Sequence, residues 1–373
     1  MHRILLSLFL SLTLGCASTT ASTRSAAPSQ TAQAAPGELE RLLSLKEIFE
    51  RMEASSVKYE LREKDSPPGG WADALWPQRV EPVPYARVVR EGSTATLAPP
   101  HYDPESERLL AEAEPHYQAD RFDEAAKLYA RATEVCPRCV NAWIFRGDAA
   151  LFSDKPEEAL GYYHRAAELN PDDYRGHFFQ GHALARLGRR AEAREAFASA
   201  LVLNPRLPTL RKLLEANPGF GLVITPDVVV PRGFAERTET GVAATYDGHY
   251  GAAWLAFAAC KALWMGEPSH RKEMTGSDSD SRFTSTEELE CLNAALSGHE
   301  LEKTKKKEDT TIQTIPDKGL ERLERIAEAG MADMLVLFEL APRVHPQATL
   351  TISADVRQRL RAYVLEYVLL ERD

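Results

Sequence analysis

The chain has 373 residues, which is enough for two or three domains, and 44% of them are hydrophobic, which is enough for a packed core. It carries 45 basic and 55 acidic side chains, giving a net charge of −10. Nonspecific binding to nucleic acids depends on Lys and Arg neutralising phosphates. This acidic balance therefore excludes a nucleic acid from the expected partners.

Residues 1–15 have the pattern of an export signal. Basic Arg3 precedes an apolar run over residues 4–14, which is too short to span a membrane. The run leads into a motif that resembles a bacterial lipobox, Leu12-Thr13-Leu14-Gly15-Cys16. The resemblance implies cleavage before Cys16 and an anchor of several acyl chains on that residue. The alternative is an ordinary signal peptide with an incidental cysteine.

The residue after Cys16 bears on localisation. In many bacteria, lipoproteins without Asp at this place are sent to the outer membrane, and here the residue is Ala17. The resemblance therefore implies an exported lipoprotein, anchored in the outer membrane and facing the periplasm.

The segment before the repeats is expected to be poor in regular structure. Residues 16–37 are small and polar, so they predict a flexible tether. Within 38–100, apolar spacing predicts a helix over about 38–55, and seven prolines predict an extended segment over 66–100. Trp71 and Trp76 are expected to attach this segment to a neighbouring surface.

From Ser106 the sequence repeats every 34 residues, in five columns that keep their spacing across three units. The columns are Ala113, Gly147 and Gly181; Ala125, Ala159 and Ala193; Tyr129, Tyr163 and Phe197; Ala132, Ala166 and Ala200; and Pro137, Pro171 and Pro205. Small residues let two helices approach closely, the aromatic ring fills the space between them, and proline ends the second helix. Residues 106–207 thus resemble the tetratricopeptide-repeat (TPR) family. Pro208 to Ala216 is expected to be a capping helix, so the array covers 106–216.

The first helices of the repeats depart from the family pattern in a way that predicts looser packing. Glu112, Arg146 and Gln180 stand where Leu is common. His116 and Ala150 stand where Tyr is common.

The resemblance implies a concave face lined by the first helices. Its central row is apolar: Leu110, Ile144 and Phe178. The two flanking rows are Glu107, Asn141 and Arg175, and Glu114, Asp148 and His182. The expected partner is a protein or peptide with an apolar or amphipathic segment. The alternative is that flanking segments of the protein itself cover the row.

Residues 220–373 are expected to form a mainly helical domain of no recognised type. Residues 220–245 contain two β-branched runs that predict one or two short strands or an extended crossing segment. Residues 250–265 predict a buried core helix, and a capping box of Ser285 and Glu288 predicts the start of another. Further helices are expected over 318–340 and 354–370, and Lys303, Lys305, Lys306 and Lys307 are expected in a loop.

Four cysteines besides Cys16 are candidates for disulfides. An exported chain meets an oxidising compartment, so Cys136 is expected to pair with Cys139, and Cys260 and Cys291 are candidates for a second bridge. The alternative for Cys136 and Cys139 is a pair of inert free thiols. The Cys-x-x-Cys spacing of the first pair also occurs in redox and zinc sites. Cys136 stands at the end of a helix, however, where the dipole disfavours a thiolate.

The sequence contains no P-loop, nucleophile elbow or His-Glu-x-x-His motif, so no catalytic residue, metal or cofactor is expected. The expected fold is mostly α: a TPR superhelix between an N-terminal tether with an extended segment and a C-terminal helical domain. The function that this predicts is a lipid-anchored envelope adaptor that is not an enzyme. The alternatives are an enzyme whose site lies in the C-terminal domain and a permanent structural subunit of an envelope assembly.

Overall fold

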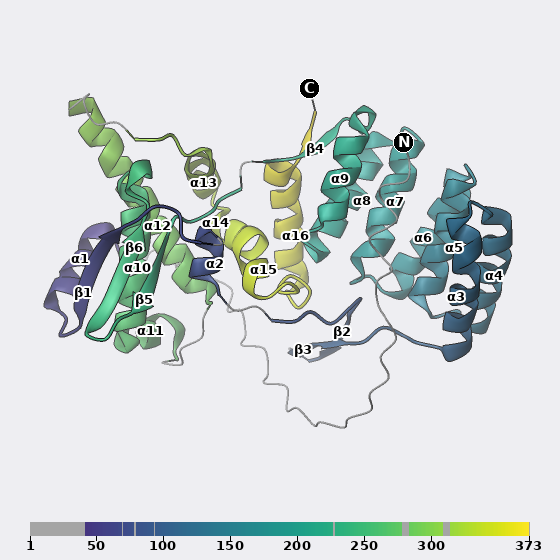
Figure 1. The fold of residues 1–373 in the computed structure, drawn as a ribbon, viewed down its shortest axis with the longest axis horizontal. Coiled ribbons are helices and arrows are strands. Elements are labelled where there is room, and N and C mark those ends of the chain that lie inside the picture. Colours follow the sequence, from purple (N-terminus) through teal and green to yellow (C-terminus); the bar gives the residue numbers. More distant parts are fainter. Residues whose placement is uncertain are drawn as a thin grey trace.

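The computed structural model describes residues 42–372 except 69, 78–79, 93, 227, 278–282 and 309–313, and it leaves out the side chains of 306–308. The expected signal peptide, Cys16 and the tether lie outside the described residues. The described chain is mostly helical, and its elements form three groups along the longest axis (Figure 1). The repeats lie at one end, a small sheet with α10–α12 lies at the other, and α13–α16 lie between them.

The repeats form three helical hairpins, as the 34-residue columns predict. Their helices are α3 (Pro104–Gln118), α4 (Phe122–Val135), α5 (Val140–Phe152), α6 (Pro156–Leu169), α7 (Tyr174–Arg186) and α8 (Arg190–Leu203). The expected capping helix is α9 (Pro208–Ala216). A Cβ built on Gly147 would lie 2.4 Å from Cε1 of Tyr163, so glycine is what permits this helix contact. The turn between the two helices of each hairpin has a residue with positive φ, namely Asp120, Asp154 or Gly188.

The segment before the repeats contains more regular structure than its prolines suggest. Its elements are α1 (Leu45–Ala54), β1 (Lys58–Glu63), α2 (Trp71–Leu75), β2 (Arg87–Glu91) and β3 (Thr94–Ala98). In the described part, the helix expected over 38–55 begins at Leu45, where Ser44 and Glu47 form a capping box. Trp71 and Trp76 are each 3% exposed, because both pack against the group that contains the sheet.

The sheet joins two parts of the chain that the sequence places in separate units. It consists of β1, β5 (Gly233–Arg237) and β6 (Gly241–Tyr246), in the order β1-β6-β5. β1 pairs parallel with β6, with Lys58 opposite Gly241, and β5 pairs antiparallel with β6. The helix α10 (Ala252–Gly266) packs against β5 and β6, and it also contacts α1, α11 (Pro268–Thr275) and α12 (Ser285–Glu308).

The third group links the sheet to the repeats. Its elements are α13 (Lys318–Glu328), α14 (Ala332–Leu335), the π-helical turn η4 (Val336–Leu340), α15 (Ala341–Val344), α16 (Ala354–Tyr363), the π-helical turn η5 (Val364–Val368) and β7 (Leu369–Glu371). β7 pairs antiparallel with β4 (Leu222–Ile224), which follows the capping helix. Arg194 of α8 donates to the carbonyl oxygens of Leu365 and Leu369, so the last repeat is fixed to this group.

Three expectations for the C-terminal third are wrong in detail. The helix expected over 318–340 is broken at Gly330, whose φ is 68°. The N-cap of α12 is Thr284 and not Ser285, because Thr284 Oγ1 accepts from the backbone of Glu287 at 3.1 Å. The lysines at 303 and 305–307 lie inside α12 and not in a loop.

Candidate functional site

The central row of the expected groove is not open. Leu110, Ile144 and Phe178 are only 5%, 2% and 8% exposed. The ring of Phe178 lies 5.0 Å from that of Phe179 and 6.2 Å from that of Phe197, so it is part of the packing between helices. The expectation of an exposed apolar row is therefore corrected, and these side chains belong to the core.

The first flanking row is closed at the third repeat. Asn141 donates to Glu107 over 3.3 Å, and both residues are half-buried. Arg175, in contrast, is 6% exposed. Its guanidinium lies 2.6 Å from a carboxylate oxygen of Asp173 and 3.5 Å from the centre of the Tyr85 ring. Tyr85, just before β2, thus covers Arg175, the cation that this row was expected to present to a partner.

The second flanking row contains two groups with shifted pKa values. Burial raises the pKa of Asp148 to about 7, although the hydrogen bond from Tyr163 and the charge of Arg175 act in the opposite direction. That bond runs from the Tyr163 hydroxyl to Oδ1 of Asp148 over 2.7 Å. Burial and the charge of Arg186 lower the pKa of His182 to about 4. His182 is therefore uncharged near pH 7, where Asp148 is about half ionised.

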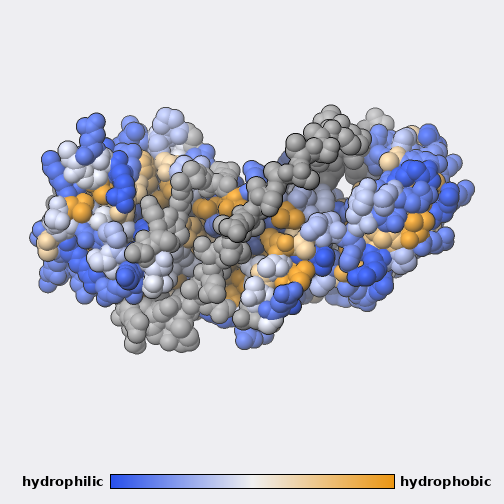
Figure 2. Space-filling model, turned by 90° about the horizontal axis from the view of Figure 1, so that it is seen from below, coloured by the Kyte–Doolittle hydropathy of each residue, from blue (hydrophilic) through white to orange (hydrophobic). Residues whose placement is uncertain are grey.

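On the concave side of the first two repeats, the charges without an ion-pair partner are negative. Among the described residues, Glu107, Glu114 and Asp148 form no ion pair. The nearby Arg186 is already engaged, because it donates to the carbonyl of Leu151 and to Asp154, each at 2.8 Å. The described surface of the repeat end is mainly hydrophilic, with small apolar patches (Figure 2). This arrangement suits contact with basic or hydrogen-bond-donating groups.

The four candidate cysteines are in disulfides in the structure. Cys136 and Cys139 join the end of α4 to the start of α5, with sulfurs 2.01 Å apart. Cys260 and Cys291 join α10 to α12, with sulfurs 2.05 Å apart. A sulfur in a disulfide is not a thiolate, so in this state neither pair offers a metal ligand or a nucleophile.

A cluster of charged residues that no sequence motif indicates is buried beside the second disulfide. Lys261 of α10 lies 2.6 Å from Glu287 and 2.8 Å from Glu288, and Trp76 donates to Glu288 over 3.2 Å. These residues are all less than 9% exposed, which leaves little access for a substrate. In the sequence, the two acids resemble the solvated first turn of any helix, so no sequence signal sets them apart.

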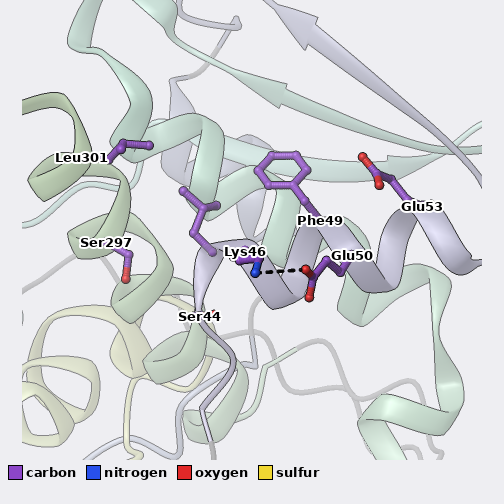
Figure 3. A pocket seen from close by; sticks show the side chains of 8 residues that line it. Ser44, Lys46, Phe49, Glu50, Glu53, Ser297 and Leu301 are labelled. Carbon is purple, nitrogen blue, oxygen red and sulfur yellow. Dashed lines mark ion pairs between the residues drawn. The ribbon is translucent and has the colours of Figure 1, made fainter. Parts of the chain in front are cut away.

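A pocket of about 570 Å³ lies between α1 and α12 (Figure 3). Phe49 of α1 and Leu301 of α12 line it from different sides (Figure 3), and Leu45 of α1 also lines it. Lys46 and Glu50 at its edge form an ion pair of 3.5 Å. Ser297, the polar lining residue from α12, donates to the backbone of its own helix. The described lining residues therefore supply an apolar contact surface and no paired nucleophile and base.

Within the described ranges, no group of three or more His, Cys, Asp or Glu could hold a metal ion. A search of the same residues finds no helix with the length and apolar character needed to cross a bilayer.

Two overlapping stretches of the chain, residues 110–155 and 146–208, match the family model described as tetratricopeptide repeat. Among solved structures, the first TPR of Spaghetti (RPAP3) bound to the HSP90 peptide SRMEEVD is 19% identical, covering 31% of this chain and 91% of that one with a TM-score of 0.29. The Yersinia enterocolitica type III secretion chaperone SycD, in complex with a peptide of the translocator YopD, is 18% identical, covering 32% and 91% with a TM-score of 0.29. The Arabidopsis OM64 TPR domain is 23% identical, covering 30% and 93%, also with a TM-score of 0.29.

A comparison with curated proteins found no match. The family match and the six helices α3–α8 agree in position, from the first helix of the first hairpin to the start of the capping helix. Residues 110–208, about a quarter of the chain, therefore match the tetratricopeptide-repeat model in sequence and form helical hairpins, within a mostly helical protein.

Proposed function

We propose that the protein is an adaptor that holds a protein partner on the concave face of its first two repeats. The observation that carries the proposal is the charge on that face. Glu107, Glu114 and Asp148 form no ion pair among the described residues, while Arg175 and Arg186 are already engaged. A partner segment with Lys or Arg side chains complements this face, and such complementarity favours fast and selective association.

The test combines partner capture with mapped variants. Crosslinked pull-down of the native protein identifies a partner, and the purified pair is then titrated. The double variant Glu114→Gln/Asp148→Asn is expected to weaken binding at least about tenfold, because it removes two carboxylates from the contact. The control is Glu134→Gln, an exposed acid on α4 that is outside the three rows. Equal loss in the control, or full binding by the double variant, would refute the concave face as the site.

We also propose that the protein acts in the cell envelope, anchored by lipid on Cys16. This rests on the lipobox-like residues 12–16 and the export signal alone. Cys16→Ser is expected to abolish labelling with a fatty-acid probe and to release the protein into the soluble fraction. A Cys16→Ser protein that is processed normally and stays with the membrane would contradict the anchor.

A permanent structural subunit of an envelope assembly is the second candidate. The observation that favours it is the closure of the third repeat by Tyr85, together with the attachment of α8 to η5. An array held in this way suits a fixed position in an assembly. The two candidate functions differ in how fast the bound partner dissociates. After dilution, an adaptor releases a labelled partner within minutes to hours, whereas a permanent subunit retains it.

A further inference from the structure

A second recess lies on the side of α5 that points away from the concave face. Its lining comes from α4, α5 and α6, and its volume is about 230 Å³. At 100° per residue, Arg146 and Ala150 lie on the opposite side of α5 from Asn141 and Asp148. The recess is therefore separate from the surface assigned to the adaptor function.

The recess occurs where this chain departs from the repeat pattern. Arg146 replaces the usual Leu, and Ala150 replaces the usual Tyr, so a large ring is missing between α4 and α6. Ala150 is 7% exposed and lies at the base of the space. In the family pattern, two apolar side chains would stand at these positions, whereas here the space is lined by a guanidinium and a methyl group.

The guanidinium of Arg146 is held in place but has no acidic partner. One of its nitrogens donates to the hydroxyl of Thr133 over 2.9 Å. Its Cζ lies 4.4 Å from the centre of the Tyr162 ring and 5.8 Å from that of Trp143. It forms no ion pair with any described carboxylate. A positioned guanidinium with free charge matches the planar geometry of a carboxylate.

The other charges around the recess strengthen this preference. Lys127 of α4 and Lys155 before α6 also line it, and neither has an ion-pair partner among the described residues. Two acids stand at the same recess, Asp123 and Glu158, and the hydroxyl of Tyr162 donates to Glu158 over 2.7 Å. Three cations against two carboxylates leave a net charge of +1, so the recess attracts one further anion.

We infer that this recess binds a carboxylate, presented by an Asp or Glu side chain of a protein partner. A volume of about 230 Å³ accepts one acidic side chain and is too small for a helix. A recess on the outer side of the repeats is also open to a partner that does not enter the concave face. The protein thus has two contact surfaces of opposite preference: basic groups inside and an acidic side chain outside.

The experiment uses residues 17–373, which lack the expected signal peptide and Cys16. The ligands are a capped peptide with a single Glu, its Gln counterpart, and glutarate as a free dicarboxylate. The Glu peptide is expected to bind, and salt should weaken its binding. The Gln peptide is expected not to bind. Arg146→Leu, which restores the usual family residue, is expected to weaken the Glu peptide at least about tenfold, because a charged hydrogen bond is lost. Arg146→Lys should lie between the two, since it keeps the charge and loses the fork.

The matched control is Arg108→Leu, in the preceding repeat. Arg108 is already bonded to Glu105 and Glu112, at 2.8 and 3.0 Å, so its loss should leave peptide affinity unchanged. Circular dichroism checks that each variant is folded. The inference is overturned if Arg146→Leu and Arg146→Lys both bind the Glu peptide like the parent, or if the parent does not bind it at millimolar concentration. Equal affinity for glutarate would also overturn it, because the recess would then be a site for free dicarboxylates.

Discussion

The repeats and the unit built around α10 and α12 pack their helices in different ways. In the repeats, the closest helix contacts are made by small residues, and Ala125, Ala159 and Ala193 are 0% exposed. In the α10–α12 unit, charged side chains enter the core: Lys261 is 6% exposed, and Glu288 is 0% exposed. Close packing of small residues tolerates no added volume, whereas a buried charge cluster tolerates no missing partner.

The two regions also differ in how far apart in the sequence their partners lie. Contacts within the repeats join a helix to the next one or two along the chain. In the α10–α12 unit, Glu290 accepts from the backbone of Leu43, 247 residues away, and Glu288 accepts from Trp76, 212 residues away. The second unit is therefore complete only when the segment before the repeats is in place.

The largest effect is expected from Lys261→Met. The variant leaves Glu287 and Glu288 buried without their cation, so it should lower the free energy of unfolding by about 3–5 kcal/mol in urea denaturation. The control replaces all three residues, as Lys261→Met/Glu287→Gln/Glu288→Gln, and should recover a large part of the loss. A single variant that stays within about 1 kcal/mol of the parent would show that these charges are not coupled.

The two disulfides should differ in the stability that they confer. Replacing Cys260 and Cys291 by Ala opens a bridge across 31 residues, and the loop-entropy relation gives a loss of about 3.5 kcal/mol. Replacing Cys136 and Cys139 opens a bridge across 3 residues and should cost less than about 2 kcal/mol. Both losses are measured by denaturation under oxidising conditions. Mass spectrometry of unreduced peptides comes first, and free thiols at all four positions would contradict both pairings.

A steric change tests the small-residue contacts of the repeats. Gly147→Leu puts atoms where Tyr163 lies, and the expected loss is about 1–3 kcal/mol or more in thermal or urea unfolding. Gly161→Leu, in the next helix, is the matched control, because a Cβ there meets nothing within 4 Å. The control should be neutral or slightly stabilising, since glycine disfavours helix by about 1 kcal/mol. Equal effects at the two glycines would mean that close packing does not limit this hairpin.

The smallest effect is expected from Asp148→Asn, and it depends on pH. The pKa of Asp148 is raised in the folded chain from 3.8 to about 7. Between these values the folded chain binds more protons than the unfolded chain, so the stability of the parent falls as pH rises. The variant lacks this loss and should gain stability relative to the parent between pH 4 and 8. The gain should be on the order of 1–2 kcal/mol, since solvent screening at a partly exposed side chain reduces the energy of the pKa shift. At pH 4 the two proteins should be equally stable, and a constant difference across the range would contradict the shift.

The repeats, the capping helix and the buried helix α10 could be predicted from the sequence. Each is specified by residues close in the chain: columns 34 apart, Pro208 before an apolar stripe, and an apolar run of helical length. The assignment of the three rows to a concave face comes from the resemblance to the repeat family, and it stays a prediction. The exposure of the side chains in these rows could not be predicted from the sequence. Whether Phe178 is open or packed depends on neighbours that the spacing does not specify.

The tertiary structure decided the features that depend on distant partners. Tyr85 covers Arg175, β1 joins β6 across the whole repeat array, and Lys261 neutralises two acids on another helix. In the sequence, Tyr85, Arg175 and the two acids resemble ordinary surface residues, because a charged or aromatic side chain acquires its role from what is brought against it. Local spacing determined which helices form, and contacts between segments tens to hundreds of residues apart determined which charges are buried and which surface remains free.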